Sequence, residues 1–217
     1  MHIPDGFLST GTSVVTWAAS AGSVGYAARR ANRELGERQV PLMGVTAAFV
    51  FAAQMMNFAV AGGTSGHLLG GALAAILLGP WPGVLVLTSV LAVQALLFQD
   101  GGLLALGANV FNMAIVGVLV GWFAYTALRR LLGDKQGTWT TMVSGFAAAW
   151  LSVFVASLVA AAEIALSGTS PWAVALPMMG TVHALIGIGE GLITVGVLAF
   201  LQAARPDLLA LGQPSNA

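Results

Sequence analysis

Apolar residues run along this chain in long stretches that short polar or glycine-rich breaks separate. An α-helix needs roughly 20 mainly apolar residues to cross the hydrocarbon core of a bilayer. Seven stretches come close to this length, with approximate bounds 11–28, 41–60, 66–80, 83–99, 103–128, 139–165 and 173–203. The third and fourth are short, and Gly79-Pro80-Trp81-Pro82-Gly83 between them predicts a tight hairpin. The pattern therefore predicts an all-α integral membrane bundle of about seven transmembrane helices.

The composition agrees with a protein that lies in a bilayer. Of the 217 residues, 58% are hydrophobic and only 7% are charged, whereas about a quarter of the residues of a soluble domain are charged. The length fits one transmembrane domain over residues 1–205, followed by a short, loose cytoplasmic tail over 206–217. The net charge is zero, which offers no basic surface to nucleic acid. The sequence therefore predicts a multi-pass protein of the cell membrane.

The basic residues determine the predicted orientation. Lysine and arginine collect in the cytoplasmic loops of membrane proteins. With seven spans and Met1 outside, all the basic residues fall on the cytoplasmic side; they are Arg29, Arg30, Arg33, Arg38, Arg129, Arg130, Lys135 and Arg205. The N-terminus is therefore predicted outside and the C-terminus in the cytoplasm. No basic segment precedes the first apolar stretch, as a secretory signal would require. Met1 is expected to be kept, because His2 is too bulky for the usual removal of the first residue.

Three absences from the sequence narrow the possible chemistry. There is no cysteine, which excludes disulfides, thiolate metal sites and cysteine nucleophiles. There is no G-x-x-x-x-G-K-[ST] phosphate loop, so energy for uphill transport must come from a partner or an ion gradient. There is no His-Glu-x-x-His cluster of a zinc hydrolase, which disfavours an intramembrane hydrolase that uses His183 and Glu190. The chain is not expected to be an enzyme.

The chain begins with Met1 and His2, and a histidine in second position has a geometric consequence. The α-amine of Met1 and the amide nitrogen of His2 close a five-membered ring on a metal ion, and that amide and the His2 Nδ1 close a six-membered ring. Three nitrogens then lie nearly in one plane, which suits Ni²⁺ or Cu²⁺ ahead of Zn²⁺. Asp5, before Gly6, is either a turn residue or an acceptor for a ligating imidazole.

His67 is the predicted source of a fourth nitrogen. It follows Gly62-Gly63-Thr64-Ser65-Gly66 at the outer mouth of the second and third stretches, on the same predicted side as the N-terminus. Thr64 or Ser65 is expected to cap the following helix, with His67 in its first turn. The imidazole would then complete a plane of four nitrogens. The alternative is a capping loop with an interfacial histidine that binds nothing.

Four amide side chains lie in apolar surroundings near the same mouth: Asn57, Gln94, Asn109 and Asn112. A buried amide needs hydrogen-bond partners, so bonding between helices is the first interpretation. The second is that Asn57 or Asn109 orients the metal-binding histidines, which adds both to the supporting candidates Asp5, Thr64 and Ser65. Asp100, before two glycines in an outer turn, is interpreted as a solvated turn residue.

His183 and Glu190 lie seven residues apart, and hence on one face of the last apolar stretch. A carboxylate inside a membrane is costly when charged, so it is paired, protonated or functional. A Glu–His pair that stabilises the bundle and a role in transport are both open. In the second case the chain is an autonomous transporter that couples metal movement to protons through Glu190.

Several motifs in the sequence are typical of one family. They are Met1-His-Ile-Pro-Asp-Gly-Phe-Leu8, Asn57-Phe-Ala-Val-Ala-Gly-Gly-Thr-Ser-Gly-His67, Leu78-Gly-Pro-Trp81, Gln94-Ala-Leu-Leu-Phe-Gln-Asp100 and Leu106-Gly-Ala-Asn-Val-Phe-Asn-Met113. With these motifs, the chain closely resembles the CbiM/NikM family over nearly its whole length. The members of this family are the substrate-binding (S) components of energy-coupling factor (ECF) transporters for cobalt and nickel.

The resemblance implies a seven-span fold whose N-terminus enters the outer cavity. It implies metal ligation by the Met1 amine, the His2 amide and imidazole, and His67. It also implies a transmembrane coupling (T) subunit, two cytoplasmic ATPase subunits and often a small accessory membrane subunit. The implied function is capture of Co²⁺ or Ni²⁺ outside the cell for ATP-driven uptake, with no cofactor. The plane of four nitrogens favours nickel, whereas cobalt uptake for cobalamin biosynthesis is equally compatible with the family.

Overall fold

A computed structural model describes residues 1–37, 39–56, 58–60, 64–133 and 137–211. Helices dominate these ranges, and two short strands interrupt them. The helices are α1 (Thr10–Glu34), α2 (Gln39–Gln54), α3 (Gly71–Leu78), α4 (Pro80–Leu97), α5 (Leu106–Asn109), the π-helix η1 (Val110–Gly117), α6 (Val118–Leu131), α7 (Thr138–Leu166), α8 (Trp172–Ala204) and α9 (Pro206–Leu211). The strands β1 (Phe58–Val60) and β2 (Thr64–Gly66) pair antiparallel.

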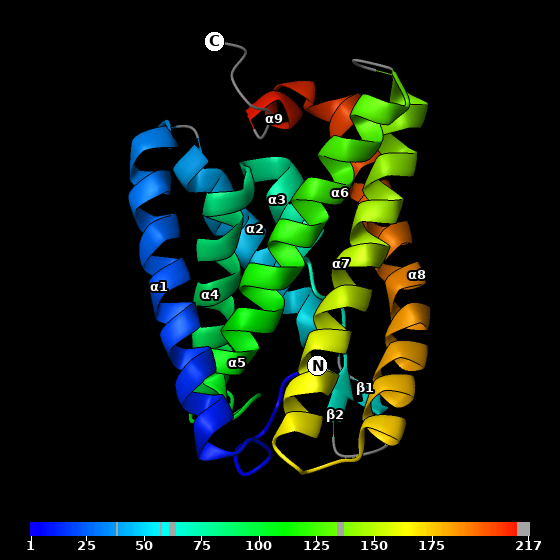
Figure 1. The fold of residues 1–217 in the computed structure, drawn as a ribbon. Coiled ribbons are helices and arrows are strands. Elements are labelled where there is room, and N and C mark those ends of the chain that lie inside the picture. The colour runs from blue at the N-terminus through cyan, green and yellow to red at the C-terminus, as the bar shows by residue number, and fades with distance from the viewer. Residues whose placement is uncertain (38, 57, 61–63, 134–136, 212–217) are drawn as a thin grey trace.

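The helices pack side by side as a bundle, with α9 across one end (Figure 1). Within the described residues, four helices are long and apolar enough to cross a membrane: Pro80–Leu97, Leu106–Leu131, Thr138–Leu166 and Trp172–Ala204. The second of these runs without a break through α5, η1 and α6. The apolar helix α2 has only 16 residues. The prediction of an all-α, multi-pass membrane fold is confirmed, and the count of seven spans stays a prediction.

The predicted bounds of the second and third spans were wrong. The second was expected over 41–60, but α2 ends at Gln54, and Phe58–Val60 form a strand instead. The third was expected over 66–80, but α3 begins only at Gly71 and has eight residues. A short apolar run has the same composition in a buried strand as in a helix, so periodicity did not separate them. The predicted hairpin after α3 is present, because Gly79 alone links Leu78 to Pro80.

The tail also differs from the prediction of a loose segment over 206–217. Pro206–Leu211 form the helix α9, and Leu209 packs against the core. Proline fits the first position of a helix, because its missing N–H has no partner to lose there. The predicted tail is therefore helical over residues 206–211, and residues 212–217 lie outside the described ranges.

Close approach of helices depends on glycine at two places. A Cβ at Gly191 in α8 would lie 2.6 Å from Phe146 Cδ2 in α7, and one at Gly121 in α6 would lie 2.7 Å from Ala72 Cα in α3. In lipid, such small residues allow helices to pack tightly without a hydrophobic driving force. These two glycines therefore pack the protein's own helices against each other. By contrast, a Cβ at Gly22 would meet nothing within 4 Å.

The two ends of the bundle differ in charge. The C-terminal ends of α1, α6 and α8 lie at one end, and the N-terminus enters the bundle near the other (Figure 1). Arg33 is in the last turn of α1, Arg129 and Arg130 are in the last turn of α6, and Arg205 follows α8. The basic residues at these helix ends therefore lie far from Met1, as the predicted orientation requires.

Candidate metal centre

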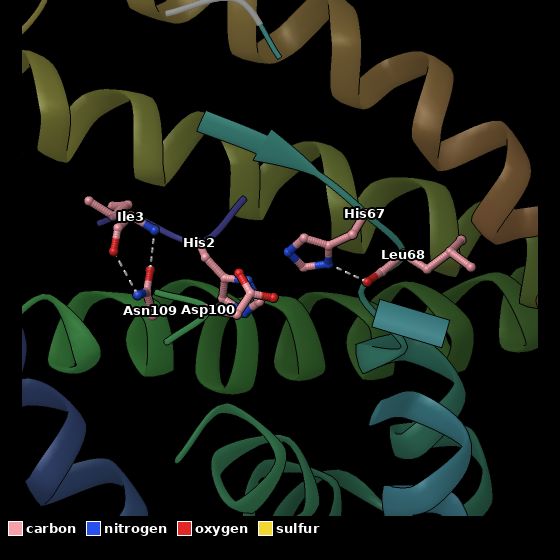
Figure 2. A network of polar contacts seen from close by, with 6 residues as sticks. All are labelled: His2, Ile3, His67, Leu68, Asp100 and Asn109. Atoms are coloured by element: carbon pink, nitrogen blue, oxygen red, sulfur yellow. Dashed lines mark hydrogen bonds and ion pairs between the residues drawn. The ribbon is translucent and has the colours of Figure 1, made fainter. Parts of the chain in front are cut away.

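Hydrogen bonds hold the first residues of the chain inside the bundle. The backbone N–H of Ile3 donates to Asn109 Oδ1 at 2.8 Å, and Asn109 Nδ2 donates back to the Ile3 carbonyl at 3.0 Å (Figure 2). The N–H of Gly102 donates to the same carbonyl at 3.0 Å. Thr169 Oγ1 donates to the carbonyl of Phe7 at 2.5 Å. The N-terminal segment is therefore a fixed part of the fold.

Burial changes the chemistry of the Met1 amine. Met1 is 1% exposed, and His2 is 4% exposed. Loss of hydration lowers the pKa of the amine from 8.0 to about 4, although the nearby Asp100 carboxylate acts in the opposite direction. The amine is therefore neutral at pH 7. Its nitrogen then carries a lone pair that suits a transition metal, and no proton has to be displaced from it.

The imidazoles of His2 and His67 lie against each other. Their ring centroids are 4.5 Å apart, and the planes differ by 23°. His67 is fully buried, and its Nδ1 lies 2.6 Å from the carbonyl of Leu68 (Figure 2). Because a carbonyl only accepts, Nδ1 of His67 carries the proton and Nε2 carries the lone pair. Among the described residues, neither His67 Nε2 nor His2 Nε2 has a hydrogen-bond partner.

Asp100, which the sequence indicated only as a solvated turn residue, lies beside His2 with a side chain that is 22% exposed. Its Oδ1 lies 3.0 Å from His2 Nδ1, although the two atoms lack the alignment of a hydrogen bond. This contact lowers the pKa of Asp100 more than partial burial raises it. The neighbouring residues adopt left-handed conformations, with φ 54° at Gln99 and 94° at Gly101. The signal was present in the sequence, since an acidic residue before Gly101-Gly102 interrupts two apolar stretches on the side of Met1.

Asp5 has a different role from the predicted acceptor for an imidazole. Its carboxylate accepts the backbone N–H groups of Leu103 at 3.1 Å, Leu104 at 2.8 Å and Ala105 at 3.1 Å. These residues immediately precede α5, so the carboxylate satisfies N–H groups that have no helical partner. Asp5 therefore ties the N-terminal segment to the start of α5.

The expected capping role of Thr64 and Ser65 was wrong. Both residues lie in β2, where their backbones pair with Val60 and Ala59. The residue before α3 is Gly70, with φ 77° and no side-chain cap. His67 therefore lies in the link between β2 and α3, and not in the first turn of a helix. Asn57 lies outside the described residues.

Two buried carboxylates in the long helices have separate partners. Glu190 of α8 accepts from the backbone N–H groups of Leu69 and Gly70, at 2.5 and 2.6 Å. His183 Nδ1 lies 2.9 Å from the carbonyl of Met179, one turn earlier in α8. The possible pairing of Glu190 with His183 is therefore replaced by two separate sets of bonds. Glu163 of α7, which no sequence motif marks, accepts from Asn112 Nδ2 at 2.7 Å.

The donor set available for a metal is unusual. In the part of the chain that the structure describes, no group of three or more histidine, aspartate or glutamate side chains is placed to hold a metal ion. Met1, His2 and His67 are nevertheless brought together from the chain end and the β2–α3 link. These three residues offer the nitrogens of the chain terminus and two imidazoles, which are donors that suit nickel and other divalent transition metals.

The stability of the N-terminal segment can be tested at Asn109. In Asn109→Ala, the buried N–H and carbonyl of Ile3 lose their side-chain partners. Leaving such a group unsatisfied costs about 1–3 kcal/mol, so we expect a clear fall in the thermal unfolding temperature of the detergent-solubilised protein. Thr88→Ala is the control, because the Thr88 hydroxyl bonds the carbonyl of Val84 within one helix. Equal unfolding temperatures for both variants would show that Asn109 does not hold the segment.

The fold defines a multi-pass integral membrane protein, and comparison with known proteins gives its family. The model of the CbiM family, described as the cobalt uptake substrate-specific transmembrane region, matches residues 2–208. The chain belongs to this family of cobalt and nickel transport proteins.

Named relatives and a solved structure agree with this assignment. The chain is 37% identical to the fused nickel transport protein NikMN of Rhodobacter capsulatus, over 97% of this chain and 64% of that protein. It is 36% identical to the cobalt transport protein CbiM of Sorangium cellulosum, over 96% of this chain and 94% of that one. A crystal structure of a transition metal transporter matches with a TM-score of 0.85 and 35% identity, over 97% of this chain and 96% of that chain.

Proposed function

We propose that this chain is the substrate-binding component of an ECF transporter, and that it captures Ni²⁺ or Co²⁺ with its own N-terminus. The proposed ligands are the Met1 amine, the His2 amide nitrogen, His2 Nδ1 and His67 Nε2. The observation that carries the proposal is that a buried, neutral chain terminus lies beside His67, whose Nε2 lone pair is buried without a partner in the described residues. Buried polar nitrogens without partners are costly, and a metal ion satisfies them.

Metal binding requires a rearrangement of the imidazoles. The stacked rings of His2 and His67 direct their faces, and not their lone pairs, toward each other. His2 Nδ1 also faces Asp100. At least one ring must therefore turn about its side-chain torsions before both lone pairs point at one ion. In the bound state, Asp100 supplies negative charge next to the cation.

The capture side follows from the charge of the bundle ends. Because basic residues prefer the cytoplasmic side, the end that carries Arg33, Arg129, Arg130 and Arg205 faces the cytoplasm. The N-terminal site then opens toward the outside. The chain has no phosphate loop, so ATP hydrolysis takes place in two partner ATPase subunits. A transmembrane coupling subunit, in some systems with a small accessory subunit, transmits their movement.

A metal titration tests the proposed site. We expect the purified protein to bind Ni²⁺ tightly, with the absorption of a planar nitrogen site. In His67→Ala one of four ligands is lost, and the affinity should fall by at least the roughly 10- to 100-fold that the loss of an outer-shell partner causes. Thr88→Ala is the control, because the Thr88 hydroxyl bonds the carbonyl of Val84 within α4, and this variant should bind normally. Competition with Co²⁺ in the same titration determines which metal is preferred. Full affinity in His67→Ala would reject the site.

A further inference from the structure

Buried side chains of α2 and α8 form hydrogen bonds to the backbone of the link that carries His67, residues 67–70. Gln54, the last residue of α2, donates its Nε2 to the carbonyl of Leu69 at 2.7 Å. Glu190 in α8 accepts the N–H of Leu69 with Oε2 and the N–H of Gly70 with Oε1. Both backbone polar groups of Leu69 are therefore bound by side chains from other helices, in place of the regular pairing that a strand or helix would supply.

Packing fixes the same link. Leu69 is fully buried, and a Cβ at Gly117 would lie 2.6 Å from its Cδ2. Gly70 has φ 77°, and a Cβ there would lie 2.7 Å from Val50 Cγ2. The gripping side chains are buried too, since Gln54 is 0% exposed and Glu190 is 2% exposed. The link therefore cannot shift without breaking buried hydrogen bonds or close contacts.

A short chain of bonds joins Glu190 to the proposed metal ligand. The carboxylate holds the N–H groups of Leu69 and Gly70, and the preceding carbonyl, that of Leu68, bonds to His67 Nδ1. That last bond assigns the proton to Nδ1 and leaves the lone pair on Nε2. The position of the Leu68 carbonyl thus determines both the tautomer and the direction of the His67 ring.

We propose that Glu190 is a positioning residue for metal capture, which holds the 67–70 link so that His67 presents Nε2 to an ion chelated by the N-terminus. This inference rests on the proposed function, because it requires His67 to be a ligand. Two successive N–H donors need two acceptor oxygens, and a carboxylate supplies them. Glutamine supplies one acceptor, and its NH₂ group would face the second N–H donor.

The test is a Ni²⁺ titration of the full-length protein with Glu190→Gln. We expect the affinity to fall about 10- to 100-fold, as for other residues that orient a metal ligand. The absorption spectrum of the loaded protein should also shift toward that of His67→Ala. Glu163→Gln is the matched control, because it neutralises another buried carboxylate, which accepts a hydrogen bond from Asn112 in η1. The control should keep both the affinity and the spectrum.

A double-mutant cycle separates positioning from general destabilisation. If Glu190 acts through His67, adding Glu190→Gln to His67→Ala should cause little further loss of affinity. An equal loss in both backgrounds, or an unchanged affinity in Glu190→Gln alone, would overturn the positioning role while the metal site stands. If His67→Ala itself binds Ni²⁺ normally, the proposed function and this inference both fail.

A second variant covers the case in which Glu190→Gln does not fold. Gln54→Met removes the hydrogen bond to the Leu69 carbonyl from the other side of the link and nearly preserves the side-chain volume. It should weaken Ni²⁺ binding in the same direction, with the same spectral shift. A well-folded Gln54→Met protein with unchanged affinity and spectrum would show that metal binding does not need the hydrogen bond from Gln54 to the link.

Discussion

Adding one residue before Met1 is expected to abolish tight metal binding. The extension converts the Met1 amine into an amide and moves the free amine by roughly 3.3–3.6 Å along the chain. The five-membered chelate ring between the amine and the His2 amide is then lost. Met1 is only 1% exposed, so the buried pocket offers little space for an extra residue. The loss should exceed the roughly 100-fold upper range for outer partners of a metal ligand, as measured by Ni²⁺ titration of a glycine-extended protein.

The matched control places the same extra glycine after Ala217, at the opposite end of the chain. That protein should bind Ni²⁺ as the unmodified chain does. Removing the added N-terminal residue with an aminopeptidase should restore binding to the extended protein. If the N-terminally extended protein kept full affinity, the ligands would have to come from elsewhere, and the N-terminal chelate would be wrong.

Gly102→Ala is expected to have the second largest effect. A methyl group at this position would overlap the backbone nitrogen and the carboxylate of Asp5. The N–H of Gly102 also donates to the carbonyl of Ile3, so the backbone has little freedom to withdraw. The N-terminal segment must therefore be displaced from its position in the bundle, which moves Met1 and His2 away from His67. We expect Ni²⁺ affinity to fall by at least the roughly 10- to 100-fold seen when a metal ligand loses its orientation.

Gly22→Ala in α1 is the control for this substitution. A Cβ at Gly22 meets no atom within 4 Å, and alanine is the better helix former by about 1 kcal/mol. That variant should fold and bind Ni²⁺ like the unmodified protein. Protease cleavage near residue 5 provides a second readout, because a displaced segment in Gly102→Ala should be cut sooner. Normal Ni²⁺ affinity and normal resistance to the protease in Gly102→Ala would contradict the close contact between Asp5 and Gly102.

Only part of the candidate site is encoded in neighbouring residues. Met1 and His2 are adjacent, so the pattern alone predicts that their nitrogens can chelate one ion. Where His67 lies in the fold was harder to predict. Its segment contains small and polar residues that fit a helix cap as well as a strand end. In the structure, the preceding residues form β2, which pairs antiparallel with β1.

The supporting residues depended on contacts between distant parts of the chain. Asp5 and Asp100 are both acidic residues next to glycines, so their local sequences are alike. In the structure, Asp5 binds the N–H groups before α5, and Asp100 faces His2. A carboxylate can accept from any donor that the fold brings within reach, so its partner is not a property of the local sequence.

The sequence alone predicts that this protein lies in a membrane, that it forms a helical bundle and which chemical groups are its candidate ligands. Apolar length and charge placement are sums over neighbouring residues, so they survive without knowledge of the fold. Three features depend on the tertiary structure: the Met1 amine is buried, Asp100 faces His2, and Glu190 binds the backbone N–H groups of the link after His67. These features join residues that are up to 121 positions apart, and packing of the whole bundle sets their distances.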